Sequence, residues 1–284
     1  MAVAAPKKSP NEMSFFEHIE VLRWHLLRAI LSILVITIIV FVLKDFVFQT
    51  VILGPTSPDF ITYRIFCEYL PQFCFYPQHL QIITRDIQEQ FISHITVSLW
   101  LGFIVSFPYI LWELWSFIKP GLYKKEIKAA RGMVFICSML FLSGISFGYF
   151  IIAPVAITFL STYSVSPEIA NTTTLAALVD SITMFTLPVG LIFETPIILY
   201  FMAKIGLVSA PYLTQYRKHA LVIIIIVAAV ITPGPDVFSQ MLVATPLYLL
   251  YEISIIVVKR IDKEKADAER KAMQEEKSEE KSEE

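Results

Sequence analysis

The sequence predicts an all-α integral membrane protein built from six kinked transmembrane helices. Of its 284 residues, 56% are hydrophobic and 17% are charged, whereas soluble domains carry about 25% charged residues. Several apolar runs approach the roughly 20 residues that a helix needs to cross a bilayer. Positive residues fall in alternate loops between these runs, as expected of a multi-pass protein. The net charge of −2 provides no basic field, so no nucleic-acid partner is expected.

Six segments are expected to span the membrane, at 24–43, 91–117, 132–159, 181–203, 219–231 and 237–258. No signal-peptide cleavage pattern follows the first segment, so it should remain as a spanning helix. The fifth segment is short, about 20 Å at 1.5 Å per residue. Segments five and six therefore either thin the membrane locally or are extended by flanking side chains.

Prolines recur inside the segments, at Pro108, Pro154, Pro188, Pro196 and Pro246. Each proline removes a backbone donor and favours a kink. Kinks in several helices indicate a curved bundle with a concave face, although prolines are also common in ordinary membrane helices.

The charges of the loops predict the orientation of the chain. Lysine and arginine precede the first segment, and they recur between segments two and three, between four and five, and after six. The other loops carry few or none, and Trp24, Trp112 and Trp115 lie at the positively charged side. This asymmetry predicts that both termini lie in the cytoplasm.

The same pattern divides the chain into three parts. A cytoplasmic N-terminal segment covers 1–23, and a membrane domain covers 24–260 and includes a long outer loop at 44–90. The tail at 261–284 is rich in Glu, Lys, Ser and Ala. We expect it to be a solvated, cytoplasmic helical extension that frays into disorder.

Two of the carboxylates that lie within apolar segments are singled out. Glu194 lies in the fourth segment with no basic residue nearby, and Glu252 lies near the inner end of the sixth. An acid in hydrocarbon is costly, so both are candidates for a functional site. The alternative for Glu194 is a structural carboxyl bonded to a neighbouring helix.

Two of the three cysteines lie close together in the outer loop. Cys67 and Cys74 either form a disulfide in an oxidising compartment or remain free thiols. A metal site is not expected there, because His79 is the one imidazole nearby. Cys137 lies within the third segment and is expected to be a small buried residue.

Four motifs, in order along the chain, resemble the TatC family, the core subunits of the twin-arginine protein translocase. They are HIEVLRWHLL at 18–27, WELWSFIKPGLYKKE at 112–126, FETP at 193–196 and TPGPDVFSQ at 232–240. The resemblance covers nearly all of 13–260. It implies a glove-shaped, six-helix receptor and scaffold in the inner membrane. Such a protein binds twin-arginine signal peptides and exports folded proteins with the proton-motive force.

The resemblance also implies partners, which are TatA- and TatB-type single-span proteins, membrane lipid and further copies in a multi-copy complex. It implies no cofactor. Glu126 matches the glutamate that contacts the arginines of the signal peptide, and a carboxylate is the natural partner of a guanidinium group. Phe117 and Tyr123 match the same motif and are expected to shape the loop.

The N-terminal motif departs from the family at one position. Leu22 and Arg23 match, but Val21 stands where relatives carry an acid. Glu20 lies one position earlier, which is a rotation of about 100° on a helix, and Glu17 is a further candidate. Which acid forms the second half of the arginine-binding site, Glu20 or Glu17, is therefore not assigned by the motif.

The remaining matches concern the membrane interior and the outer face. Glu194 matches a glutamate that faces the concave pocket and is thought to meet the single-span partners. Gln240 begins the sixth segment and, with Glu252, is a further candidate for binding a partner helix. Asp236 either serves the same purpose or caps the sixth segment. Pro55 corresponds to a structural proline of the first outer loop.

No catalytic motif for nucleotide, metal or serine chemistry is found, so an enzyme is not expected. None of the five histidines has a cysteine or carboxylate at ligand spacing. The alternative to a translocase subunit is a proton-coupled small-solute transporter with Glu194 as its carrier site, but no paired halves are visible. An intramembrane hydrolase lacks a nucleophile and base.

Overall fold

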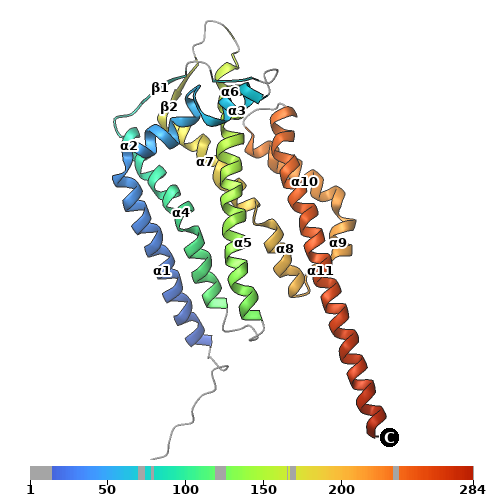
Figure 1. Ribbon diagram of the computed structural model, residues 1–284. Coiled ribbons are helices and arrows are strands. Elements are labelled where there is room, and N and C mark those ends of the chain that lie inside the picture. The colour runs from blue at the N-terminus through green and yellow to red at the C-terminus, as the bar shows by residue number, and fades with distance from the viewer. Residues whose placement is uncertain are drawn as a thin grey trace, which may run out of the picture. The chain divides into compact units, whose positions relative to one another are not determined.

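The structure, a computed structural model, describes residues 15–69, 74–77, 80–118, 126–164, 166, 171–232 and 237–283 (Figure 1). These residues are mostly helical and fall into two compact units. Unit 1 comprises Met1–Gly54, Gln81–Leu142 and Thr172–Thr183, and unit 2 comprises Pro55–Leu80, Ser143–Asn171 and Met184–Glu284.

Unit 1 contains α1 (Phe15–Val42), α2 (Lys44–Phe46), the π-helical turn η1 (Val47–Ile52), β1 (Gln81–Ile83), α4 (Glu89–Ile118), β2 (Thr172–Thr174) and the first parts of α5 (Glu126–Phe147) and α7 (Leu175–Ile192). α1 and α4 lie side by side (Figure 1). They approach closely at Gly102, where a Cβ atom would lie 2.2 Å from Thr37 Oγ1. Phe107 of α4 stacks on Phe141 of α5 with ring centroids 3.6 Å apart.

The expectation of a purely helical protein is wrong in one detail. β1 and β2 form a short parallel ladder that pairs Gln81 with Thr172. The three threonines of β2 are β-branched and favour an extended backbone. Beside the ladder, the Glu89 carboxylate accepts hydrogen bonds from the backbone N–H of Arg85 (2.6 Å) and Ala176 (2.8 Å). It thereby joins the first turns of α4 and α7.

Unit 2 contains most of η2 (Gly54–Thr56), α3 (Ile61–Tyr69), η5 (Gly148–Ile152), α6 (Ala153–Thr162), α8 (Thr195–Lys204), α9 (Ala210–Gln215), α10 (Arg217–Ile231), α11 (Val237–Glu283) and the last parts of α5 and α7. Two apolar clusters hold it together. One joins α6, α7, α10 and α11 around Phe185, Val189 and Val243. The other joins α8, α9 and α11 around Ala203, Ile255 and other apolar residues.

At two of the prolines, a threonine hydroxyl donates to the carbonyl four residues earlier, which the proline cannot serve with an N–H. Pro196 leaves the Ile192 carbonyl without its helical N–H, and Thr195 Oγ1 donates to that carbonyl (2.5 Å). Pro154 likewise deprives Phe150 O, which accepts from Thr62 Oγ1 of α3 (2.5 Å). The fourth predicted segment is therefore not one continuous helix, because it breaks into α7 and α8 between residues 192 and 195.

The α8–α9 connection is hydrogen-bonded to the middle of α11. Gly206 ends α8 at a φ of +85°, a left-handed conformation that glycine adopts without strain. Lys265 Nζ donates to Ala203 O at the end of α8 (2.9 Å), and Asp262 Oδ2 accepts from the Ala210 N–H that begins α9 (2.7 Å). A cation therefore meets the negative end of one helix and an anion meets the positive end of the next.

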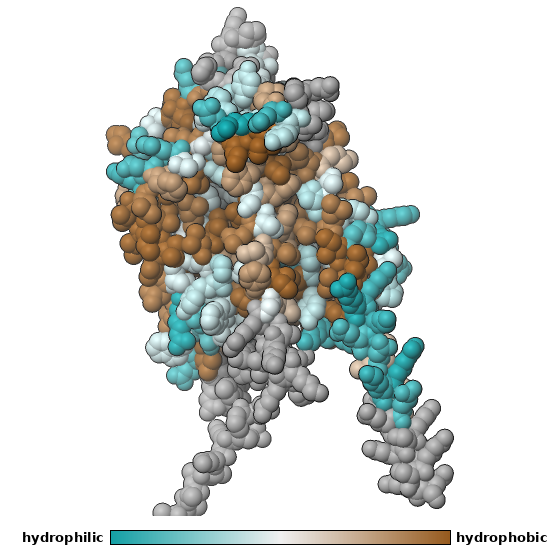
Figure 2. Space-filling view, in the orientation of Figure 1, coloured by the Kyte–Doolittle hydropathy of each residue, from teal (hydrophilic) through white to brown (hydrophobic). Residues whose placement is uncertain are grey.

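Five stretches of the described helices are long and apolar enough to cross a membrane: Ile19–Val42, Glu89–Phe117, Gly132–Thr162, Leu175–Lys204 and Gln240–Lys271. Figure 2 shows their brown, hydrophobic side chains over much of this face. α10 has 15 residues, which is too few for the usual crossing. The sixth span and the orientation of the termini therefore stay predictions. The tail is helical as far as Glu283, where α11 ends. That the tail frays into disorder stays a prediction.

Candidate functional site

A buried polar cluster joins α1 to α4 near the start of α1. His25 Nδ1 lies 2.5 Å from Glu113 Oε2, and the Tyr109 hydroxyl donates to Glu113 Oε1 (2.7 Å). The side chains of His25 and Glu113 are only 18% and 10% exposed. Both carboxylate oxygens therefore have partners, which a carboxylate needs when it is withdrawn from water.

The sequence has no histidine with a carboxylate at ligand spacing, and this cluster forms without such spacing. His25 and Glu113 are 88 residues apart in the chain, so their pairing depends on how α1 packs against α4. A signal for Glu113 was present, because it is an acid inside the predicted segment 91–117. The argument that singled out Glu194 applies to it equally.

One residue of the predicted signal-peptide site lies at this cluster. The ring of Phe117, in the last turn of α4, meets the His25 ring edge-on with centroids 6.2 Å apart. Val21 is partly buried one turn before His25 on α1, so the position that lacks the family's acid lies on the same stretch of helix.

The other predicted signal-peptide residues are described in part or not at all. Glu20 and Arg23 are exposed on α1, and Arg23 Cζ lies 5.7 Å from the centre of the Trp24 ring. Glu126 is the first residue of α5. Its side chain lies outside the described residues, as do those of Glu17 and Tyr123.

A second cluster of the same kind joins α10 to α11. Arg217 donates from a guanidinium nitrogen to Glu252 Oε2 (2.7 Å), and the Tyr248 hydroxyl donates to Glu252 Oε1 (2.9 Å). The Arg217 and Glu252 side chains are 42% and 28% exposed. Glu252, a candidate for binding a partner helix, thus has an ion pair within its own unit.

Glu194 lies at the break between α7 and α8. Its residue is 8% exposed, and its carbonyl accepts the N–H groups of Ile197 and Ile198 at the start of α8. The neighbouring Phe193 packs on Gly144, where a Cβ atom would lie 2.8 Å from the Phe193 ring. The helix break at Pro196 and the packing of Phe193 on Gly144 together fix the backbone that carries this buried acid.

The second intramembrane candidate, Gln240, has a partner on a neighbouring helix. Gln240 Nε2 donates to Ile225 O of α10 (3.0 Å). Asp236, at the turn before α11, lies outside the described residues. Its capping or partner-binding role remains a prediction.

Tyr63 of α3 joins three parts of unit 2. Its hydroxyl donates to Pro55 O (2.8 Å) and lies 3.2 Å from Pro154 O. Burial raises the pKa of Tyr63 to about 12, although a hydrogen bond with Thr158 opposes the shift. Pro55 is itself fully buried, so its carbonyl is a fixed acceptor.

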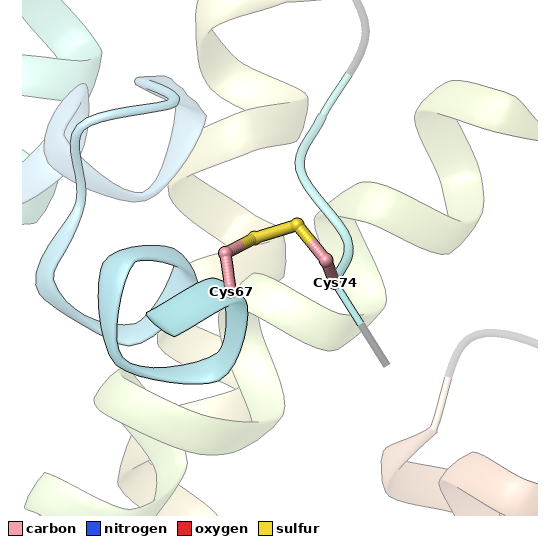
Figure 3. Close-up of a disulfide and its surroundings, with 2 residues drawn as sticks. All are labelled: Cys67 and Cys74. Atoms are coloured by element: carbon pink, nitrogen blue, oxygen red, sulfur yellow. A yellow bond between two sulfur atoms is a disulfide. The ribbon is translucent and has the colours of Figure 1, made fainter. Parts of the chain in front are cut away.

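A disulfide closes the segment that follows α3. Cys67 and Cys74 are bonded through their sulfur atoms (Figure 3), which is the first of the two alternatives for this pair. Cys137 is a buried free thiol in α5. Among the residues that the structure describes, no group of three His, Cys, Asp or Glu side chains is placed to hold a metal ion.

Comparison with known proteins gives one consistent result. Residues 17–246 match the family described as TatC, Sec-independent protein translocase protein. A protein of that name from Blattabacterium sp. subsp. Periplaneta americana is 40% identical over 266 residues, covering 91% of this chain and 100% of the relative. The namesake from Carboxydothermus hydrogenoformans is 33% identical over 262 residues, covering 91% and 98%.

Two solved structures are similar to the fold. Both are crystal structures described as the twin-arginine translocase receptor TatC. One has a TM-score of 0.66 at 32% identity and covers 86% of this chain and 100% of that chain. The other has a TM-score of 0.63 at 31% identity and covers 87% and 100%.

Proposed function

This chain belongs to the TatC family of Sec-independent protein translocase proteins, and we propose that it is the receptor and scaffold subunit of such a translocase. It is a multi-pass protein of the inner membrane, with five stretches in its described helices that are long and apolar enough to cross a bilayer. In the proposed role it binds twin-arginine signal peptides at its cytoplasmic side. With single-span partners, in a multi-copy complex, it exports folded proteins with the energy of the proton gradient.

The observation that carries the receptor role is the loop motif that ends at Glu126. The similar crystal structures are described as receptors, and the motif residues Phe117 and Glu126 flank the segment between α4 and α5. Phe117 rests on His25, which is held by Glu113. A binding residue that packs on a hydrogen-bonded pair loses little freedom when a ligand binds.

The orientation is part of the proposal. The positive loops, including the one that contains Lys124 and Lys125, lie in the cytoplasm. The segment closed by the Cys67–Cys74 disulfide then lies outside the cytoplasm, in the compartment where disulfides persist.

Glu126 provides the direct test. In Glu126→Lys, the site should repel the arginines of a signal peptide, and crosslinking of a twin-arginine peptide to the Phe117 region should be abolished. Glu269→Lys is the matched control, because it makes the same charge change at an exposed position of α11. Undiminished crosslinking in Glu126→Lys contradicts the receptor role.

Glu194 tests the proposed contact with single-span partners. Glu194→Gln keeps a hydrogen-bonding group of the same size, so co-purification with a single-span partner should fall less than in Glu194→Ala. Site-specific crosslinks from positions 194 and 240 should reach the same partner. An equal loss in both variants rejects hydrogen bonding as the basis of the contact.

A proton-coupled solute transporter remains the competing function, and uptake distinguishes it. Vesicles that contain this chain alone should accumulate no small solute when a proton gradient is applied. Uptake that is lost in Glu194→Gln would favour the transporter.

A further inference from the structure

A groove runs between α1 and α4 in unit 1, one turn beyond the His25–Glu113 cluster. Its volume is about 370 Å³, and it is open along one side. Arg28 and Tyr109 lie at one end, and Val35 and Ile36 lie towards the other. From residue 28 to residue 36 the α1 wall is roughly 12 Å long, at 1.5 Å per residue.

The hydroxyl groups around this groove are already used inside the protein. Ser32 Oγ donates to Ala29 O (2.7 Å), Ser106 Oγ donates to Ser32 O (3.2 Å), and the Tyr109 hydroxyl donates to Glu113 (2.7 Å). The remaining wall is apolar and exposed, with Leu31 at 60%, Val35 at 49% and Val105 at 57%. The groove therefore offers an apolar channel to an occupant along most of its length.

Arg28 is the exception. It is exposed, and within the described residues it has no hydrogen bond or ion pair. It acts on Glu113 only by Coulomb attraction at longer range, because His25 and Tyr109 occupy both oxygens of that carboxylate. One end of an apolar channel thus carries a guanidinium group that has no hydrogen-bond partner among the described residues.

The position of Arg28 along α1 makes this charge informative. The apolar stretch begins at Ile19, and Trp24, an exposed residue of the type that marks membrane interfaces, lies four residues before Arg28. Arg28 is therefore about 6 Å deeper than Trp24. A cation at that depth needs an anion or water, and a guanidinium group binds phosphate oxygens in a bidentate manner.

We propose that this groove binds one anionic phospholipid, with its phosphate at Arg28 and an acyl chain along Leu31 and Val35. The charge at one end and the apolar wall elsewhere match an amphiphile. A soluble phosphate would leave the wall exposed to water, and a polar solute would find no free hydroxyl donors. In the proposed orientation, the lipid comes from the cytoplasmic leaflet.

The test is native mass spectrometry of the full chain in detergent with two added lipids. The probes are palmitoyl-oleoyl phosphatidylglycerol and palmitoyl-oleoyl phosphatidylcholine, which share acyl chains and differ in net charge. The protein should retain the anionic lipid about fivefold better than the zwitterionic lipid. Arg28→Gln should remove this preference, whereas Arg28→Lys should keep part of it because the positive charge remains.

Controls separate the groove from the general charge of the protein. Lys218→Gln removes one exposed positive charge from α10 and should leave the preference unchanged. Val35→Trp should fill the channel and reduce retention of both lipids. Circular dichroism of each variant should match that of the parent chain, since Arg28 and Val35 are exposed.

Three results would overturn the proposal. One is equal retention of both lipids by the parent chain. Another is an undiminished preference in Arg28→Gln. The third is displacement of phosphatidylglycerol by inorganic phosphate at millimolar concentration, which would indicate a simple anion site. The assay contains no cargo, so its failure would leave the receptor role untouched.

Discussion

The α1–α4 pair and the α10–α11 pair each contain a hydrogen-bonded cluster of a glutamate, a tyrosine and a basic side chain, but the packing around the two clusters differs. In each pair a glutamate accepts a hydrogen bond from the tyrosine four residues earlier, Tyr109 to Glu113 and Tyr248 to Glu252. In each pair a basic side chain of the other helix completes the cluster. The bases differ, because α1 contributes the imidazole of His25 and α10 contributes the guanidinium group of Arg217.

The packing behind the two clusters differs more than the clusters themselves. Between Ile19 and Val42, α1 buries one hydrophobic residue, Ala29, among the described side chains. α10 and α11 take part in an apolar cluster that includes Ala228, Ile231 and Val243. On the α1 side, therefore, few apolar side chains are fully buried behind the polar cluster, whereas both α10 and α11 contribute fully buried apolar side chains to a shared cluster.

The largest expected difference comes from reversing the charge of the two glutamates. Glu113→Lys removes the carboxylate partner of His25 and puts an ammonium group into a buried site, which should cost roughly 3–5 kcal/mol of unfolding free energy. Glu252→Lys should cost less, because Arg217 is 42% exposed and can turn to water. Thermal unfolding in detergent measures both. An equal loss in the two variants would break the comparison.

Glycine substitutions give the next effect. Gly102→Val puts a side chain onto Thr37, where even a Cβ atom would lie 2.2 Å from Oγ1. Overpacking of this kind costs roughly 1–3 kcal/mol, so α1 should separate from α4. A crosslink between cysteines introduced at positions 36 and 105 should become slower. Gly132→Val is the control, because nothing lies within 4 Å of its added Cβ.

The smallest effect concerns unit 2 at high pH. The neutral hydroxyl of Tyr63 is favoured by burial, and its pKa of about 12 exceeds the ordinary value of 10. Its contribution to stability is complete below pH 10 and is lost as the pH rises through 12. At pH 11 the loss is about 1.4 kcal/mol. Tyr63→Phe should reduce this pH dependence, and an unchanged decline in the variant would contradict the assignment to Tyr63.

The sequence predicted the features that depend on local composition. Apolar runs gave the helices, and the tight spacing of Cys67 and Cys74 made their disulfide one of two alternatives. The four motifs identified the family before any geometry was known. The weakness of the fifth segment was also visible, because 13 apolar residues are too few for a bilayer at about 1.5 Å each.

Contacts between distant residues could not be predicted in the same way. The His25–Glu113 pair spans 88 residues, and the threonines that replace proline's missing donors act through the folded backbone. Thr62 and Thr195 look like ordinary polar residues in the sequence. The β1–β2 ladder joins two outer segments that no local period connects.

The hydrogen bonds of Asp262 and Lys265 set the shortest C-terminus with which the protein should still fold normally. A protein that stopped at Arg260 would keep every predicted membrane crossing. It would still lose both side chains that bind the α8–α9 connection. The Ala203 carbonyl at the end of α8 would then lose its lysine donor. Among the described side chains, none beyond Lys271 makes a hydrogen bond of this kind to α8 or α9. A stop codon placed after Lys271 should therefore leave folding unchanged.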